Sequence, residues 1–149
     1  TINEMAVADR VGEVSLYVPE SDGAANSGWA SIAPSTRRPA AITVPTVSLD
    51  EYASGRRMPA LIKLDIEGSE PAALAGMREL LSRDDAPDLV VEVNTFLLER
   101  LGTSPAAVIG PLESAGYELF AMHDHGIAPL TAHTEFDQLT DVYATKRGA

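Results

Sequence analysis

The chain has 149 residues, which is enough for one domain with its own core. Its 22 acidic and 11 basic residues give a formal net charge of −11, which argues against nucleic-acid binding through a basic face and against attachment to an anionic membrane. The sequence has no cysteine, which excludes disulfides and thiolate metal sites. No apolar run approaches the ~18 residues of a membrane-spanning helix, and no signal-peptide pattern opens the chain, so we expect a cytoplasmic protein.

The first third of the sequence predicts short strands around a long loop. Residues 2–8 predict a short strand, and residues 11–18 alternate apolar and polar side chains as half-buried strands do. Residues 19–39 are rich in Pro, Ser, Gly, Ala and Asn and predict a loop, whose Trp29 could close over a ligand or anchor the loop to the body. Residues 41–47 predict another strand, in which Pro45 indicates an edge or a bulge.

A helical turn at residues 49–52 leads into a strand–helix–strand unit. The apolar runs 60–65 and 89–93 are typical of central parallel strands. Between them Ser69 is expected to cap a helix that has Pro71 in its first turn. The apolar positions of that helix, at helical spacing, are Leu74, Met77 and Leu81.

The last third adds two helices and two strands. A short helix or turn is expected over 95–101, and a second helix over 104–116, in which Pro111 should cause a kink or a split. Strands follow at 117–122 and 141–145. The order strand, helix, strand, helix, strand, strand indicates an α/β fold with a mostly parallel sheet and a terminal antiparallel hairpin.

Carboxylate and amide side chains follow the two central strands. Asp65 and Glu67 come after the first, where Gly68 predicts a turn, and Glu92 and Asn94 end the second. Ligands of open α/β sheets bind beyond the carboxyl ends of the strands, so these four residues are candidates for a site. Their oxygens could hold a hard cation or a substrate hydroxyl. Alternatively, Glu67 and Glu70 complement a helix dipole, and Glu92 and Asn94 cap the turn after their strand.

Other polar patterns are weaker. His123 and His125 could bind a metal, although such histidines are more often exposed turn residues. The arginine pairs 37–38 and 56–57 are expected on solvated loops or against an anionic substrate. No glycine-rich phosphate loop, nucleophile elbow or HExxH motif occurs.

Taken in order, five segments resemble the FkbM family of S-adenosylmethionine-dependent methyltransferases. The resembling segments are AVADRVG (6–12), VPTVSLDEY (44–52), LIKLDIEGSE (61–70), PDLVVEV (87–93) and GYELF (116–120). The resemblance implies a Rossmann-like class I methyltransferase fold with a seven-stranded sheet and a reversed hairpin at one edge. It also implies methyl transfer from S-adenosylmethionine to a hydroxyl of a sugar, a polyketide or a similar small metabolite.

The resemblance also implies roles for individual residues. The implied catalytic residues are Asp65, Glu67 and Glu92. The implied cofactor-binding residues are Val7, Ala8, Asp9 and Asp65. Asn94 and Trp29 are assigned to the substrate, and a divalent metal held by Asp65, Glu92 and Asn94 is a further hypothesis.

The family's first two strands and its glycine-rich loop have no counterpart here, so we expect residues 1–149 to be the C-terminal portion of a catalytic domain that binds the methyl donor weakly. The edge of the 60–65 strand should then be unpaired and apolar. A homo-oligomer or an N-terminal segment is expected to cover it. Two alternatives stay open: a metal-assisted hydrolase or lyase, and a non-catalytic acidic module that binds a partner by strand addition.

Overall fold

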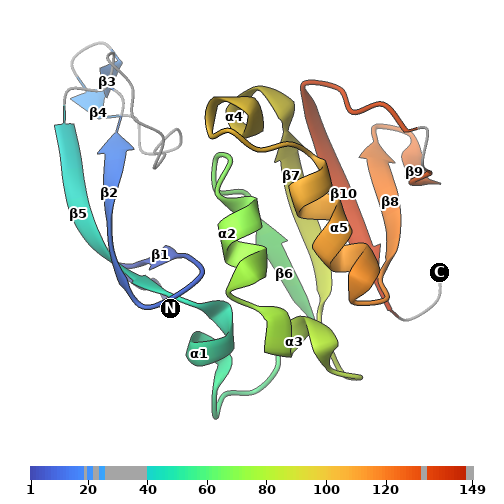
Figure 1. The fold of residues 1–149 in the computed structure, drawn as a ribbon, viewed down its shortest axis with the longest axis horizontal. Coiled ribbons are helices and arrows are strands. Elements are labelled where there is room, and N and C mark those ends of the chain that lie inside the picture. The colour runs from blue at the N-terminus through green and yellow to red at the C-terminus, as the bar shows by residue number, and fades with distance from the viewer. Residues whose placement is uncertain (19, 22–23, 26–39, 132–133, 147–149) are drawn as a thin grey trace.

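The computed structural model describes residues 1–18, 20–21, 24–25, 40–131 and 134–146, which form an α/β fold with mixed sheets (Figure 1). The strands are β1 (Ala6–Val7), β2 (Gly12–Val18), β3 (Glu20–Ser21), β4 (Ala24–Ala25), β5 (Ala40–Val47), β6 (Leu61–Leu64), β7 (Asp88–Asn94), β8 (Glu118–His123), β9 (Gly126–Pro129) and β10 (Leu139–Thr145). The helices are α1 (Leu49–Ala53), α2 (Glu70–Ala75), α3 (Arg78–Ser82), α4 (Thr95–Arg100) and α5 (Ala106–Ser114).

The larger sheet has five strands in the order β6-β7-β10-β8-β9. Strands β6 and β7 are parallel, whereas β10 runs antiparallel to both β7 and β8. The expected mostly parallel sheet is therefore wrong, because the last strand inserts between two strands that run the same way. The expected β8–β10 pairing forms, but it does not lie at the edge, since the unpredicted β9 adds to β8.

Strand β6 is the other edge of this sheet. Among the described residues it pairs with β7 alone, and Leu61 is 53% exposed. The unpaired edge expected for this strand is thus present. Lys63, which is exposed on the same short strand, carries the kind of charge that discourages edge-to-edge association.

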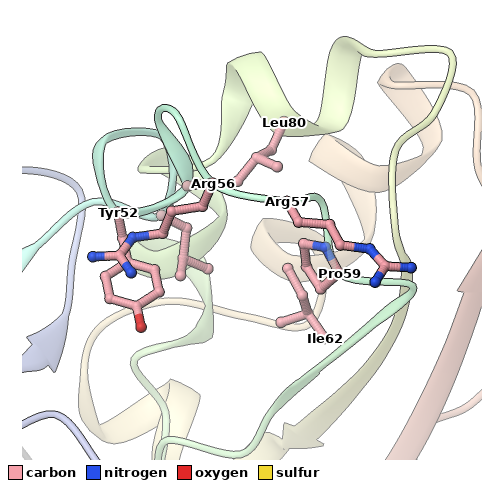
Figure 2. Close-up of a pocket in the computed structure, with 8 residues that line it drawn as sticks. Tyr52, Arg56, Arg57, Pro59, Ile62 and Leu80 are labelled. Atoms are coloured by element: carbon pink, nitrogen blue, oxygen red, sulfur yellow. The ribbon is translucent and has the colours of Figure 1, made fainter. Parts of the chain in front are cut away.

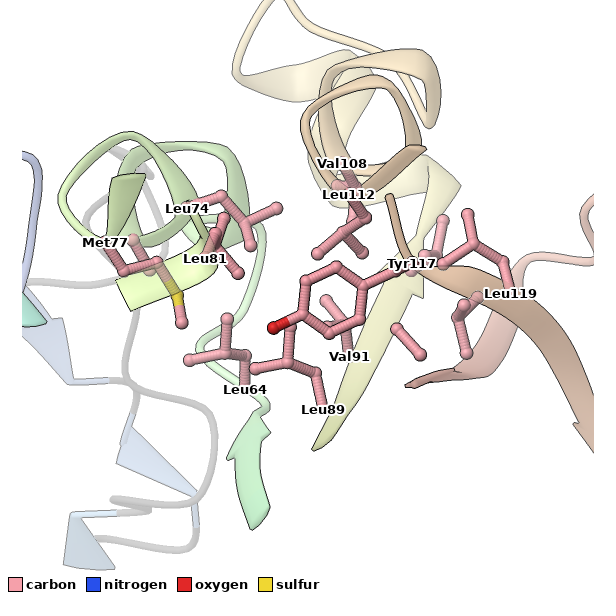
Figure 3. Close-up of a cluster of buried hydrophobic side chains, with 14 of the residues drawn as sticks. Leu64, Leu74, Met77, Leu81, Leu89, Val91, Val108, Leu112, Tyr117 and Leu119 are labelled. Carbon is pink, nitrogen blue, oxygen red and sulfur yellow. The ribbon is translucent and has the colours of Figure 1, made fainter. Parts of the chain in front are cut away.

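The core lies between the five-stranded sheet and the helices α2, α3 and α5, which cover the same face in Figure 1. Burial along β7 alternates, with Leu89, Val91 and Val93 fully buried and the residues between them only partly buried. The strand is therefore covered mainly on one face. The side chains that Figure 3 labels in this cluster are Leu64, Leu74, Met77, Leu81, Leu89, Val91, Val108, Leu112, Tyr117 and Leu119.

A second sheet has three strands in the order β1-β5-β2. Strand β5 lies in its centre, parallel to β1 and antiparallel to β2. At Pro45, however, β5 pairs with β2 alone among the described residues, so this part of the strand is an edge, which was one of the two interpretations of the proline. The proline is tolerated because β1 pairs only with Thr46 and Val47 and begins one residue beyond it. The strand expected over 2–8 shrinks to these two residues of β1.

The helix expected after Ser69 is broken at Gly76 and Met77 into α2 and α3. A Cβ built at Gly76 would collide with the carbonyl oxygen of Ala8 and lie 3.1 Å from the Cα of Asp9. The glycine therefore allows the segment after β1 to approach the helix break directly. Ser69 occupies the N-cap position of α2 but makes no capping hydrogen bond with its side chain.

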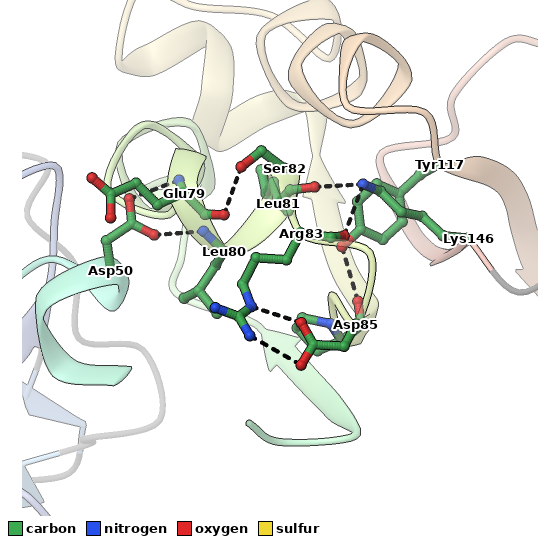
Figure 4. Close-up of polar contacts among 10 residues, drawn as sticks. Asp50, Glu79, Leu80, Leu81, Ser82, Arg83, Asp85, Tyr117 and Lys146 are labelled. Carbon is green, nitrogen blue, oxygen red and sulfur yellow. Dashed lines mark hydrogen bonds and ion pairs between the residues drawn. The ribbon is translucent and has the colours of Figure 1, made fainter. Parts of the chain in front are cut away.

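The break gives α3 a start of its own, which Asp50 of α1 caps (Figure 4). The carboxylate oxygens of Asp50 accept hydrogen bonds from the backbone N–H groups of Leu80 (2.8 Å) and Glu79 (3.0 Å). At the other end of α3, the ammonium of Lys146 donates a hydrogen bond to the carbonyl oxygen of Leu81 (2.7 Å). Side chains distant in sequence thus satisfy both ends of this short helix.

Helix α5 runs without a break from Ala106 to Ser114, so the split that was considered at Pro111 does not occur. Its two buried residues, Val108 and Leu112, lie on either side of the proline in the sequence and are fully buried. Packing of this apolar face against the core outweighs the hydrogen bond that proline removes.

Candidate functional site

The chain leaves β6 through the predicted glycine turn. Glu67 has a φ of 57° and Gly68 a φ of 93°, so two successive residues have a backbone with positive φ, which residues with a Cβ rarely adopt. A Cβ on Gly68 would lie 2.9 Å from Leu101 Cδ1 and 3.1 Å from Leu97 Cβ. Position 68 therefore requires glycine for both its conformation and its close packing on and just beyond α4.

Asp65 lies at the carboxyl end of β6 and pairs with Lys63 of the same strand. The ammonium and carboxylate are 2.9 Å apart, and 38% of the Asp65 side chain is exposed. The hydrogen bond to Asp65 is the main reason that the pKa of Lys63 is raised. The carboxylate is thus held in place but remains open to a ligand.

Glu92 is the half-buried acid of this region. Leu64 pairs with Val91, so Glu92 lies one residue further along the neighbouring strand, and it sits directly opposite Asp141 of β10. Burial, followed by the charges of nearby carboxylates, raises the pKa of Glu92 to about 7. Those carboxylates, in decreasing order of effect, are Asp65, Glu67, Glu70 and Asp141. The structure therefore brings together the three predicted acids Asp65, Glu67 and Glu92.

Two further acids of this region were not predicted to belong to it. Glu70 is 1% exposed, and its Oε1 accepts hydrogen bonds from the N–H groups of Ile66 (2.9 Å) and Gly68 (3.3 Å). Burial raises the pKa of Glu70, and neither its Oε2 nor Oδ1 of Asp141 has a hydrogen-bond partner in the described structure. The short spacing from Gly68 could have indicated Glu70, whereas the place of Asp141 depends on strand pairing that the sequence does not reveal.

The predicted substrate residues have different outcomes. The side-chain oxygen of Asn94 accepts a hydrogen bond from the N–H of Leu97 (3.2 Å) and caps α4, as its alternative interpretation proposed. Trp29 lies outside the described residues. A role for either one in binding substrate stays a prediction.

The predicted cofactor residues at the end of β1 lie apart from Asp65. Ala8 and Asp9 approach Gly76, which follows the last residue of α2. Asp65 and Glu67, in contrast, come before the first residue of that helix. The six residues of α2 correspond to a helix about 9 Å long. Asp9 makes an exposed ion pair with Arg10 (3.1 Å). The structure therefore places these candidates at opposite ends of one helix.

The described residues contain no group of three His, Asp or Glu side chains that could hold a metal ion. His123 and His125 are exposed, at and just after the end of β8. None of the helices in the described part of the chain is long and apolar enough to cross a membrane.

A separate pocket of about 320 Å³ lies near the start of β6 (Figure 2). Its lining includes Tyr52, Arg56, Arg57, Pro59 and Ile62. The guanidinium of Arg56 lies 4.5 Å from the centre of the Tyr52 ring, while the side chain of Arg57 extends to the other side of Pro59. This pocket is lined by α1, the 56–59 connection, Ile62 of β6 and Leu80 of α3, and not by the acids at the far end of β6.

The described residues thus form a mixed α/β fold with acids gathered at the carboxyl ends of two neighbouring strands. A family model described as the methyltransferase FkbM domain matches residues 1–119, and the chain therefore belongs to the FkbM methyltransferase family. No curated protein and no solved structure gives a significant match. The matched region contains β6 and β7 with Asp65, Glu67 and Glu92, and it ends within β8. The resemblance noted in the sequence is confirmed.

Proposed function

We propose that the chain is an S-adenosylmethionine-dependent O-methyltransferase domain that acts, in the cytoplasm, on a hydroxyl of a small metabolite such as a sugar or a polyketide. Family membership supports the methyltransferase activity. The observation that supports a hydroxyl as the acceptor is Glu92, a half-buried carboxylate at the end of β7 whose pKa is raised to about 7. A hydroxyl needs a proton acceptor to become a nucleophile, and a group with a pKa near the working pH suits that task.

The carboxylates at this end of the sheet are suited to binding S-adenosylmethionine. S-adenosylmethionine, when bound, supplies the methyl group on a positively charged sulfonium, and its ribose carries hydroxyls. Carboxylates are suitable partners for both kinds of group, and the buried Oδ1 of Asp141 lacks a partner in the described structure. We assign Asp65 and Glu67 to holding the donor at this end of the sheet, and Val7, Ala8 and Asp9 to its adenine side.

The remaining residues act on the acceptor. Deprotonated Glu92 accepts the proton of the acceptor hydroxyl, so the rate should rise with pH through about 7. Asn94 and Trp29 are proposed to contact the acceptor, Asn94 through the part of its amide that capping does not use. We assign no step to a divalent metal.

The test begins with calorimetric titration of the 149-residue chain with S-adenosylhomocysteine, followed by methyl-transfer assays on a panel of hydroxylated metabolites. Glu92→Gln should lower the rate at least about 100-fold, because the proton acceptor is lost. Glu118→Gln, at an exposed acid of β8, is the matched control and should leave the rate unchanged. A near-normal rate in Glu92→Gln would show that Glu92 is not the base.

One observation favours a second candidate function, partner binding. The edge of β6 is unpaired in the described structure and Leu61 is half exposed, which suits strand addition by a second copy or by an N-terminal segment. Light scattering across a concentration series tests the homo-oligomer. A monomer at every concentration would exclude the second copy as the occupant of this edge.

A further inference from the structure

We infer that Glu70 is a positioning residue, which holds the Ile66–Gly68 turn in place and thereby fixes Asp65 and Glu67 at the end of β6. The side chain of Glu70 bends back from the first residue of α2 toward the turn before it. Its Oε1 accepts two backbone hydrogen bonds, from Ile66 N–H at 2.9 Å and from Gly68 N–H at 3.3 Å. These two N–H groups flank Glu67.

The turn needs such support because of its backbone conformation. Glu67 is the non-glycine residue with positive φ in the described structure, and this conformation is disfavoured for a residue with a Cβ. β6 has ended at Leu64, so no strand ladder satisfies the N–H groups of Ile66 and Gly68. A carboxylate is a strong acceptor for both, and two bonds to one oxygen restrict the residue between them.

The simpler explanation is that Glu70 is an acid in the first turn of a helix, where it stabilises the dipole. Glu79 occupies that role in α3, and its side chain is exposed to solvent. Glu70 instead is 1% exposed and keeps one oxygen without a partner. Burial of a carboxylate is unfavourable and is not needed for the dipole, so it indicates that the contacts to the turn are the purpose of this side chain.

The role in methyl transfer rests on the proposed function, because Glu70 acts through Asp65 and Glu67 and need not touch substrate. The hydrogen bonds by which Glu70 restrains the turn do not depend on any activity of the protein. The two parts can therefore be tested separately in the same protein.

The first experiment is NMR on the 149-residue chain. In the wild type we expect scalar coupling across the hydrogen bonds, from the amide nitrogens of Ile66 and Gly68 to the carboxyl carbon of Glu70. Absence of both couplings would overturn the inference, even if every variant failed to fold.

The second experiment compares Glu70→Met, which keeps the length of the side chain but has no acceptor oxygen, with Glu70→Gln, which keeps one. Hydrogen exchange of the Ile66 and Gly68 amides should accelerate at least about tenfold in Glu70→Met and change little in Glu70→Gln. The carboxyl carbon signals of Asp65 and Glu67 should shift in the Met variant alone. Glu79→Ala is the matched control for loss of a first-turn acid and should alter none of these signals. Unchanged exchange in Glu70→Met would contradict the inference.

Where methyl transfer is measurable, Glu70→Met should lower kcat at least about tenfold with KM for the methyl donor nearly unchanged, and Glu70→Gln should restore kcat. A chain that shows the NMR effects and binds S-adenosylhomocysteine, but transfers no methyl group to any hydroxylated metabolite of the panel, would contradict the proposed function and leave the positioning role of Glu70 supported.

Discussion

The two larger sheets of this molecule differ in how they are stabilised. The five-stranded sheet contributes fully buried side chains to the core, and three helices cover that face. In the described part of the three-stranded sheet no apolar side chain is fully buried, and Ile42 is 50% exposed. Its connection to the rest relies on close contacts around the α2–α3 break, such as Ala8 on Gly76. We infer that the first sheet sets the global stability and that the second one opens more easily.

The largest expected effect comes from a cavity in the five-stranded sheet. Leu89→Ala removes a fully buried side chain of β7 and should lower the free energy of unfolding by about 3 kcal/mol. Ile42→Ala, the matched change in the three-stranded sheet, should cost less than about 1 kcal/mol because the side chain is half exposed. Urea unfolding of both variants measures the difference. Equal costs would contradict the comparison.

The next effect concerns the junction between the sheets. Gly76→Ala places a Cβ against the backbone of Ala8 and Asp9 and should cost about 2 kcal/mol, because backbone atoms must move. Hydrogen exchange should accelerate first in β1, β2 and β5. The control is Gly110→Ala in α5, where a Cβ meets nothing within 4 Å, and it should stabilise the protein by about 0.5 kcal/mol. If both variants behave alike, the contact at Gly76 does not join the sheets.

A smaller loss is expected when the cap of α3 is removed. Asp50→Ala deletes the acceptor for the N–H groups of Glu79 and Leu80 and should cost about 1 kcal/mol. Thermal unfolding should show this loss, whereas Glu51→Ala, at the exposed neighbouring acid, should change the Tm little. Equal Tm values for the two variants would show that Asp50 does not stabilise this helix.

The smallest effect depends on pH and should be confined to the five-stranded sheet. Because the pKa of Glu92 is raised to about 7, its ionisation opposes folding, and the native state loses stability as pH rises from about 4.5 through 7. Glu92→Gln should therefore stabilise the protein by about 1 kcal/mol at pH 8, a value reduced for the partial exposure of the group, and by nothing at pH 4. Denaturant unfolding at the two pH values checks the sign. A variant that is less stable at pH 8 would show that ionised Glu92 stabilises the native state.

Local patterns were enough to predict much of the fold. The apolar runs of β6 and β7, and the glycine turn at Gly68, depend on neighbours in sequence and were found. The insertion of β10 between β7 and β8 was not predicted, because it depends on pairing between distant strands. The break at Gly76 was missed for the same kind of reason, since it depends on the approach of Ala8.

The candidate site shows the same limit. The grouping of Asp65, Glu67 and Glu92 could be predicted because adjacent parallel strands end at one edge of a sheet. Asp141 was missed because its position follows from antiparallel register with Glu92. The separation of Asp9 from Asp65 likewise follows from how β1 packs, which its few residues do not specify.

The central position of β10 also bears on how the chain folds during synthesis. Strands β7 and β8 leave the ribosome first, but in the described structure no ladder joins them until β10 has emerged. The nascent chain therefore exposes two unpaired strand edges beside an incomplete core, the kind of surface that chaperones bind. We expect the larger sheet to close in a single late step, after translation has passed Thr145, and not to grow strand by strand.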